Sequence, residues 1–139
     1  MKNLLPALLM ISMFLSCKEK TDDTACEDKI CTEEFRSLVI KFTDNKGAPA
    51  EVKDFSVVNQ RSGERIYANS AMASNLVKGS YIIVDDGNTP KLSEAGDDLK
   101  ITGTSVETNQ KKSVLVNVKG GKCACHISKA SGPEQVTFD

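Results

Sequence analysis

The chain of 139 residues carries 18 Lys and Arg against 19 Asp and Glu, for a formal net charge of −1, and it has no Trp. This length suits one domain of the common size of ~100 to 150 residues. Because both signs of charge are interspersed along the chain, it lacks the clustered basic residues of a DNA- or RNA-binding face, and we exclude a nucleic-acid partner. We expect a mainly aliphatic core, since aromatic residues make up only 5% of the chain.

The first 16 residues are predicted to be a targeting segment that is not part of the fold. Lys2 supplies a positive end, and residues 4–15 form an apolar run shorter than the ~20 residues that a membrane-spanning helix needs. The small residue Ser16 directly precedes Cys17. Residues 14–17 (FLSC) resemble the lipobox of bacterial lipoproteins, which implies cleavage before Cys17, a diacylglycerol thioether on its sulfur and an acyl group on its new amine. The alternative is a cleaved secretory signal followed by an unrelated cysteine.

The next segment, residues 17–30, is expected to be a charged, flexible tether between the lipid and a folded domain at 31–139. Two or more acyl chains hold a protein stably at a membrane, so we expect the mature chain to be anchored rather than to span the bilayer. Lys18 after the lipid cysteine argues against inner-membrane retention, and the acidic residues that follow resemble surface-export signals of Bacteroidetes lipoproteins. The expected location is therefore the bacterial cell envelope, at the outer membrane, facing the periplasm or the surface.

Beyond residue 31, short alternating runs are separated by turn residues at intervals of ~8 to 12 residues, which is typical of an all-β domain. Residues 69–77 fit either a weak strand or an irregular crossing, and residues 88–97 are predicted to be a polar loop. The Gly120-Gly121 pair predicts a tight hairpin between two strands. The expected strands are residues 35–43, 52–60, 65–68, 80–85, 99–105, 113–119, 122–128 and 135–138.

Alternation within these runs also predicts which side chains are buried. In the first run, Leu38, Ile40 and Phe42 share one face of the strand, while Lys41 lies on the other. Four residues sit centrally in their runs and are expected in the core: Ile40, Val57, Ile83 and Val116.

Seven or eight strands with short turns bury one face of each sheet most simply as a two-layer sandwich, with a small barrel as the alternative. Residues 43–49 (TDNKGAP) and 76–84 (LVKGSYIIV) resemble the carboxypeptidase regulatory-like and transthyretin-like sandwich domains. In those domains, a strand ending in D-x-x-G-x-P comes first and an L-x-x-G-x-Y-x-V segment forms a later core strand. The resemblance covers residues 38–85. It implies an Ig-like or transthyretin-like sandwich with a binding or spacer role and no catalysis.

Four cysteines remain beside the lipid-bearing one: Cys26, Cys31, Cys123 and Cys125. In an oxidising envelope they are most simply two disulfides. The C-A-C-H segment offers the alternative of a soft-metal or redox site built from Cys123, Cys125 and His126. Its C-x-C spacing differs from the C-x(2-4)-C knuckles that are usual in structural zinc sites, so we expect no metal and no other cofactor.

We expect the disulfides to join the N-terminal segment to the C-terminal hairpin. In a strand, the Cα atoms of Cys123 and Cys125 would lie ~6.6 Å apart, near the upper limit for a disulfide, and both sulfurs would point to one face. Each would then accept a partner from an adjacent segment. Two of the three possible pairings are of this kind, and the sequence leaves both open. Cys31 with Cys125 is preferred, because Cys31 directly precedes the first expected strand.

Motifs for catalysis are absent from the sequence, which has one His and neither G-x-S-x-G nor H-E-x-x-H. The doublets Asp85-Asp86 and Asp97-Asp98 are interpreted as solvated turns at strand ends, the alternatives being a calcium site or an acid/base pair. We therefore expect a lipid-anchored, non-enzymatic binding, adhesion or scaffolding module whose partner is an envelope protein or a glycan. The alternative is a soft-metal or redox protein, and a third class is a glycan-processing enzyme that would depend on Asp85 or Asp97.

Overall fold

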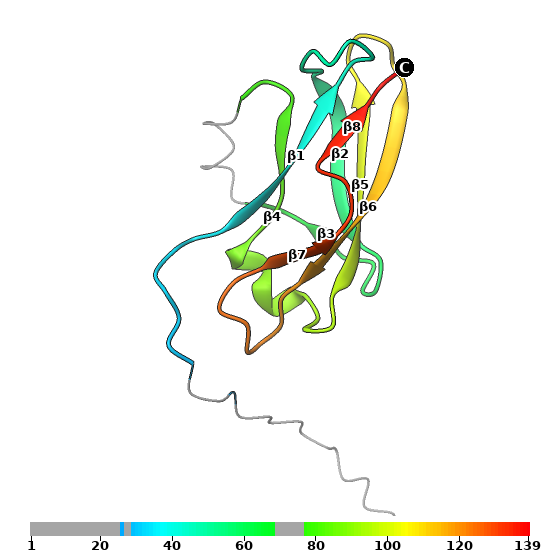
Figure 1. The fold of residues 1–139 in the computed structure, drawn as a ribbon. Helices are drawn as coiled ribbons and strands as arrows, with labels where there is room; N and C mark the ends of the chain where they lie inside the picture. The colour runs from blue at the N-terminus through cyan, green and yellow to red at the C-terminus, as the bar shows by residue number, and fades with distance from the viewer. Residues whose placement is uncertain (1–25, 27–28, 69–76) are drawn as a thin grey trace, which may run out of the picture.

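The computed structural model describes residues 26, 29–68 and 77–139, and these fold into two β-sheets that face each other (Figure 1). The smaller sheet has the strand order β4-β1-β8 and the larger one the order β3-β2-β5-β6-β7. The predicted all-β, two-sheet sandwich of about eight strands is thus confirmed. The strands are β1 (Ser37–Thr43), β2 (Val52–Asn59), β3 (Arg65–Ile66), β4 (Ser80–Asp85), β5 (Asp97–Ser105), β6 (Lys111–Lys119), β7 (Ser128–Ser131) and β8 (Gln135–Thr137).

Strand β1 forms the middle of the smaller sheet. It pairs antiparallel with β4, and it pairs parallel with β8, where Phe42 lies opposite Val136. Ile40 and Phe42 are buried and Lys41 is exposed, as the alternation predicts. All other strand pairs in the described ranges are antiparallel. The chain therefore begins and ends its sandwich with two neighbouring strands.

The two sheets enclose a core of mainly aliphatic side chains. Each of the four residues predicted to be central, Ile40, Val57, Ile83 and Val116, is at most 3% exposed. An aromatic cluster fills one part of this core, around Phe42. The ring of Phe42 stacks on Phe138 at a centroid distance of 5.6 Å, and Tyr81 meets it edge-on, also at 5.6 Å. Phe55 completes the aromatic cluster by stacking on Tyr81 at 4.9 Å.

Three predicted element boundaries need correction. The strand expected at 65–68 has only two residues, because only Arg65 and Ile66 pair with β2. The polar loop expected at 88–97 overlaps a 3-10 helix, η1 (Asp86–Lys91), which contains Pro90. The strand expected at 122–128 is instead a loop, and β7 begins only at Ser128. Most of the unassigned segment 69–77 lies outside the described residues, as do the predicted signal, Cys17 and most of the tether. No helix in the described ranges is long and apolar enough to cross a membrane.

Candidate functional site

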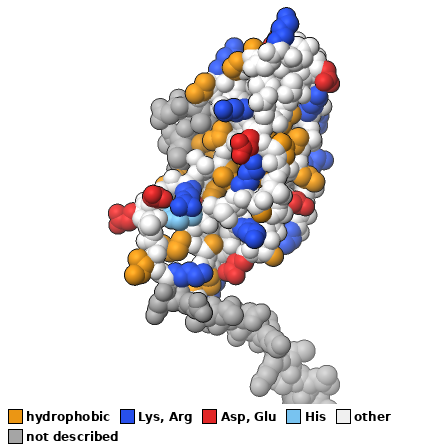
Figure 2. All heavy atoms as spheres, in the orientation of Figure 1, with side chains coloured by type: hydrophobic (Ala, Val, Ile, Leu, Met, Phe, Trp, Pro, Cys, Tyr) orange, Lys and Arg blue, Asp and Glu red, His pale blue; other side chains and the backbone are white. Residues whose placement is uncertain are grey.

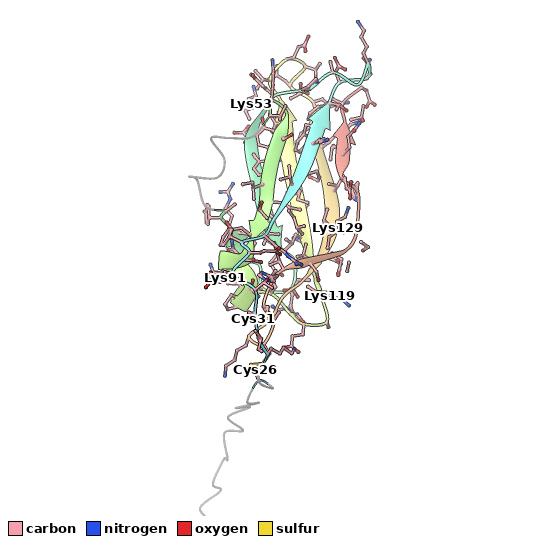
Figure 3. The ribbon with its side chains drawn as sticks, turned by 60° about the vertical axis from the view of Figure 1, so that its left-hand side comes forward. Cys26, Cys31, Lys53, Lys91, Lys119 and Lys129 are labelled. Atoms are coloured by element: carbon pink, nitrogen blue, oxygen red, sulfur yellow. A yellow bond between two sulfur atoms is a disulfide. The ribbon has the colours of Figure 1, made fainter. Side chains whose placement is uncertain are left out.

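Two disulfides fasten the N-terminal arm, residues 26 and 29–36, to one end of the sandwich. Cys26 is bonded to Cys123 and Cys31 to Cys125, and the Cα atoms of each pair are 5.3 Å apart, within the usual range for a disulfide. This is the arm-to-C-terminus arrangement that the sequence predicts, including the preferred partner of Cys31. Figure 3 shows Cys26 and Cys31 at one end of the sandwich and Lys53 near the other.

The arm is bonded to a loop, the cysteine loop (residues 120–127), rather than to the expected strand. Gly121 explains the difference, because its φ of +112° lies in a region that favours glycine and takes the chain out of the sheet. A Cβ at this position would collide with the Glu94 side chain. The Gly121 N–H donates to the Thr89 carbonyl oxygen at 2.8 Å, so the loop bonds to η1 and not to a neighbouring strand. The two disulfides then fix the loop from the other side.

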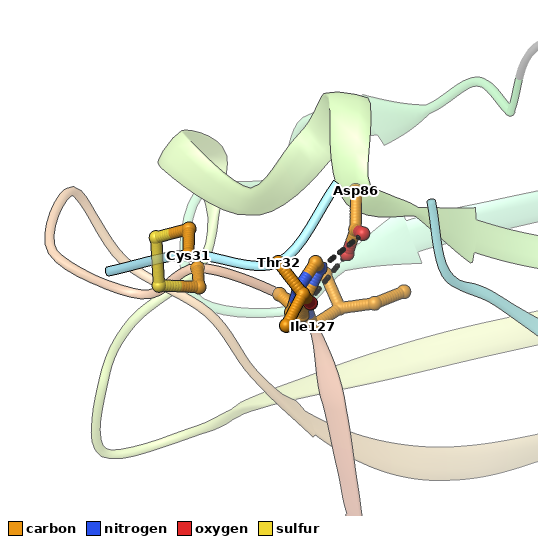
Figure 4. The surroundings of a disulfide bond; sticks show 6 residues. Cys31, Thr32, Asp86 and Ile127 are labelled. Carbon is orange, nitrogen blue, oxygen red and sulfur yellow. Dashed lines mark hydrogen bonds and ion pairs between the residues drawn. A yellow bond between two sulfur atoms is a disulfide. The ribbon is translucent and has the colours of Figure 1, made fainter. Parts of the chain in front are cut away.

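Asp86 joins the arm, η1 and the cysteine loop (Figure 4). Its carboxylate accepts the backbone N–H groups of Arg36 and Ile127, both at 2.8 Å. His126 Nδ1 lies 2.7 Å from the same carboxylate. Burial acts to raise the pKa of Asp86, but these hydrogen bonds outweigh it and hold the pKa below its usual value. Because an ionised carboxylate only accepts, His126 donates from Nδ1.

The other ring nitrogen of His126, Nε2, lies 2.9 Å from the Thr32 hydroxyl oxygen. The order carboxylate, imidazole, hydroxyl is that of a hydrolase triad. However, the hollow of about 230 Å³ that His126 lines does not include Thr32, so it does not place a substrate beside that hydroxyl. Thr32 follows the disulfide-bonded Cys31 directly, and its bond to His126 adds a further link between arm and loop. We therefore interpret Asp86, His126 and Thr32 as a structural hydrogen-bond network that holds the arm against the cysteine loop.

Asp97, at the start of β5, forms a second polar centre. Its carboxylate accepts two hydrogen bonds from the Arg61 guanidinium, at 2.6 and 2.9 Å. It also accepts the Asn59 amide at 2.7 Å and the Ser93 N–H at 3.1 Å. The hydrogen bond from Arg61 is the main reason that the pKa of Asp97 is lowered, against the opposing effect of burial. This centre ties the turn after β2 to the loop that precedes β5.

The interpretation of the aspartate doublets as solvated turns is wrong for most of their members. Asp85 and Asp97 are each only 2% exposed, and Asp86 is bonded as described above. Only Asp98 is exposed, and it accepts a hydrogen bond from the Asn117 amide. The sequence holds a usable signal, since a doublet at a strand end places one carboxylate on the inward face. Their partners Arg61 and His126 could not be found in this way, because they lie far away in the sequence.

The part of the chain that the structure describes offers no free thiolate for the soft-metal alternative. Both cysteines expected at that site, Cys123 and Cys125, are disulfide-bonded to Cys26 and Cys31, and a thiolate is the form that binds a soft metal. His126, the remaining proposed ligand, is engaged by Asp86 and Thr32. Across the described residues there is no group of three or more His, Cys, Asp or Glu side chains that could hold a metal ion.

Charge on the viewed face of the molecule is mixed. Figure 2 shows Lys and Arg side chains interspersed with Asp, Glu and apolar ones over the sandwich. That face therefore carries no single-signed patch of the kind that a nucleic acid would need.

Comparison with known families, with curated proteins and with solved structures gives no match to this chain.

Proposed function

We propose that this chain is a lipid-anchored module of a bacterial cell envelope, at the outer membrane, and that its sandwich binds or scaffolds without catalysis. The observation that carries the proposal is the covalent attachment of Cys26 to one end of the sandwich. Cys17, the expected lipid site, is nine residues before Cys26. Nine extended residues reach about 30 Å, so a lipid on Cys17 would hold the disulfide end near the membrane surface. The opposite end of the sandwich would then project away from it.

The chemistry of the polar centres supports a non-enzymatic role. His126 is the single histidine of the chain, and both of its ring nitrogens are used to hold the arm. Asp86 and Asp97 are likewise engaged by backbone and side-chain donors from their own fold. Groups that are saturated in this way stabilise loops rather than exchange protons with a substrate.

Membrane fractionation with radiolabelled palmitate tests the anchor. The parent chain is expected in the membrane fraction and labelled, whereas Cys17→Ser is expected to be unlabelled and either soluble or left as an uncleaved precursor. A Cys26→Ser/Cys123→Ser variant is the matched control, because it loses two cysteines and keeps Cys17. A Cys17→Ser chain that is processed and membrane-bound like the parent would end the proposal.

Site-specific labelling tests which end faces the membrane. Lys53 and Lys119 lie towards opposite ends of the sandwich (Figure 3). In membranes that carry the anchored protein, we expect Lys53→Cys to react faster than Lys119→Cys with a bulky polyethylene glycol maleimide. In detergent the two rates should converge. Equal rates in both settings would contradict the end-on orientation.

A further inference from the structure

The few aromatic residues of this chain fall into two groups. Phe42, Phe55, Tyr81 and Phe138 form the aromatic cluster in the core. Of the aromatic residues that the structure describes, this leaves two. They are both exposed, Phe35 by 52% and Tyr67 by 70%, which is unusual for rings of this size.

Both exposed rings line the same hollow, which has a volume of about 320 Å³ and lies against η1. Asp85, Asn88 and Lys91 also line it. Tyr67 in addition borders a second hollow of about 550 Å³. Tyr67 and Ala68 line both hollows, so the two hollows are neighbours.

The polypeptide around the rings is held in place before any ligand arrives. The Asn88 amide donates to the Tyr67 carbonyl oxygen at 3.1 Å and to the Asp85 carboxylate at 2.8 Å. The guanidinium carbon of Arg65 lies 5.9 Å from the centre of the Tyr67 ring, a cation–π distance. Asp86 N–H donates to the Arg36 carbonyl oxygen at 3.0 Å, which fixes the residue next to Phe35. A site that is fixed in this way costs little conformational entropy on binding.

The charges that a ligand meets at these hollows are positive. Arg65 lines the larger hollow and Lys91 the smaller one. Among the described residues, the Lys91 ammonium forms a surface ion pair with Glu64 at 3.4 Å, and the Lys91 side chain is 45% exposed. Asp85 is the one carboxylate in the two linings, and it is buried. Carboxylates on the ligand would therefore find complementary partners.

We propose that these adjoining hollows bind an oligosaccharide that carries carboxylate groups. This deepens the proposed binding role and rests on it. The apolar face of a sugar ring stacks on Tyr67 and Phe35, while sugar carboxylates pair with Lys91 and Arg65. A peptide is a poorer fit to the smaller hollow. Extended peptides are recognised through the backbone of a strand edge, but among its lining residues only Asp85 belongs to a strand.

Calorimetric titration of the detergent-solubilised full chain tests the proposal, with tetragalacturonate as the carboxylated probe and cellotetraose as the neutral one. We expect tetragalacturonate to bind more tightly. Tyr67→Ala should weaken its binding at least tenfold, and Tyr67→Phe should restore it, because the ring remains. Lys91→Gln should weaken binding several-fold and reduce its dependence on salt. Leu115→Ala is the matched control, since Leu115 is an exposed apolar residue on β6 that lines neither hollow.

Several outcomes would overturn the proposal. These are no binding of either glycan, or equal affinity for tetragalacturonate and cellotetraose. The proposal would also fail if Tyr67→Ala bound tetragalacturonate as tightly as the parent chain does, or if an extended acidic peptide bound more tightly than tetragalacturonate. Each leaves the anchor proposal intact if Cys17→Ser still leaves the membrane fraction. Conversely, a soluble parent chain that binds tetragalacturonate through Tyr67 would refute the anchor and keep the glycan site.

Discussion

The two ends of the sandwich are held together by different forces. The end remote from the disulfides contains the aromatic cluster, in which Phe42 contacts Phe55, Tyr81 and Phe138 across both sheets. The disulfide end contains the buried carboxylate of Asp97, the half-buried carboxylate of Asp86 and two cross-links, and its segments are mostly loops. Where strands continue, their backbone groups bond to neighbouring strands, and burial of apolar side chains is enough to hold the two sheets together. Where they stop, backbone donors need acceptors, and Asp86 and Asp97 supply them.

The two ends also differ in how they contribute to the free energy of unfolding. Apolar burial stabilises the folded state directly, by roughly 25 cal/mol per Å². A disulfide acts mainly by restricting the unfolded chain. The remote end should therefore respond to changes in side-chain volume, and the disulfide end to reduction and to acid.

Removing both disulfides is expected to have the largest effect. Their partners are 97 and 94 residues apart, so the first cross-link contributes up to about 4.7 kcal/mol in the chain-entropy model. The second adds less, because the same two segments are already joined. Urea unfolding of the protein with and without reductant measures the sum. A Cys26→Ala/Cys123→Ala variant should lose only part of it, and an unfolding midpoint that does not change on reduction would contradict this account.

Truncation of central core side chains is expected to have the next largest effect. Ile40→Ala is expected to lower the free energy of unfolding by about 2 to 4 kcal/mol, through lost burial and a cavity. The same loss is expected at Val57, Ile83 and Val116. Lys41→Ala is the matched control on the opposite face of β1 and should stay within about 0.5 kcal/mol. Equal thermal shifts for Ile40→Ala and Lys41→Ala would contradict the register of β1.

At the disulfide end, Asp97→Asn should cost about 1 to 3 kcal/mol, since it removes the charged acceptor of Arg61, Asn59 and Ser93. Arg61 is half exposed, so water screens part of the ion pair and the cost stays below that of a fully buried one. The neighbouring Asp98→Asn is the control, because Asp98 is exposed. Denaturant titration compares the two variants, and equal losses would show that burial of Asp97 is unimportant.

Acid should weaken the two carboxylate centres of the disulfide end. The pKa values of Asp86 and Asp97 are lowered in the folded state, so their contribution to stability is complete above the unfolded value of about 3.9 and is lost as the pH falls through the folded pKa. The free energy of unfolding should thus decline below about pH 4. In Asp97→Asn this decline should be shallower. A steeper decline in the variant than in the parent would contradict the conclusion that ionised Asp97 stabilises the folded state.

Local patterns in the sequence predicted the features that depend on residues close together in the chain, namely which side chains are buried and where strands end. Alternation placed Ile40 and Phe42 in the core, and turn residues located most strand ends. The cysteine loop was predicted wrongly as a strand, because its conformation depends on the bond from Gly121 to Thr89 and on two distant cysteines. The bonds between Arg61 and Asp97 and between Thr32 and His126 join residues 36 and 94 positions apart. Such pairs are set by the tertiary fold, which local periodicity does not encode.

The parallel pairing of β1 with β8 also fixes the order in which the chain can fold. Strand β1 is among the first segments of the sandwich to leave the ribosome, yet its partner at Gln135–Thr137 is the last strand. The smaller sheet therefore cannot close until β8 has been synthesised, and contacts so distant in sequence form slowly. If residues 1–16 act as an export signal, as the sequence predicts, that signal would have time to engage its receptor while the sandwich is still open. The domain would then complete its fold only on the far side of the membrane.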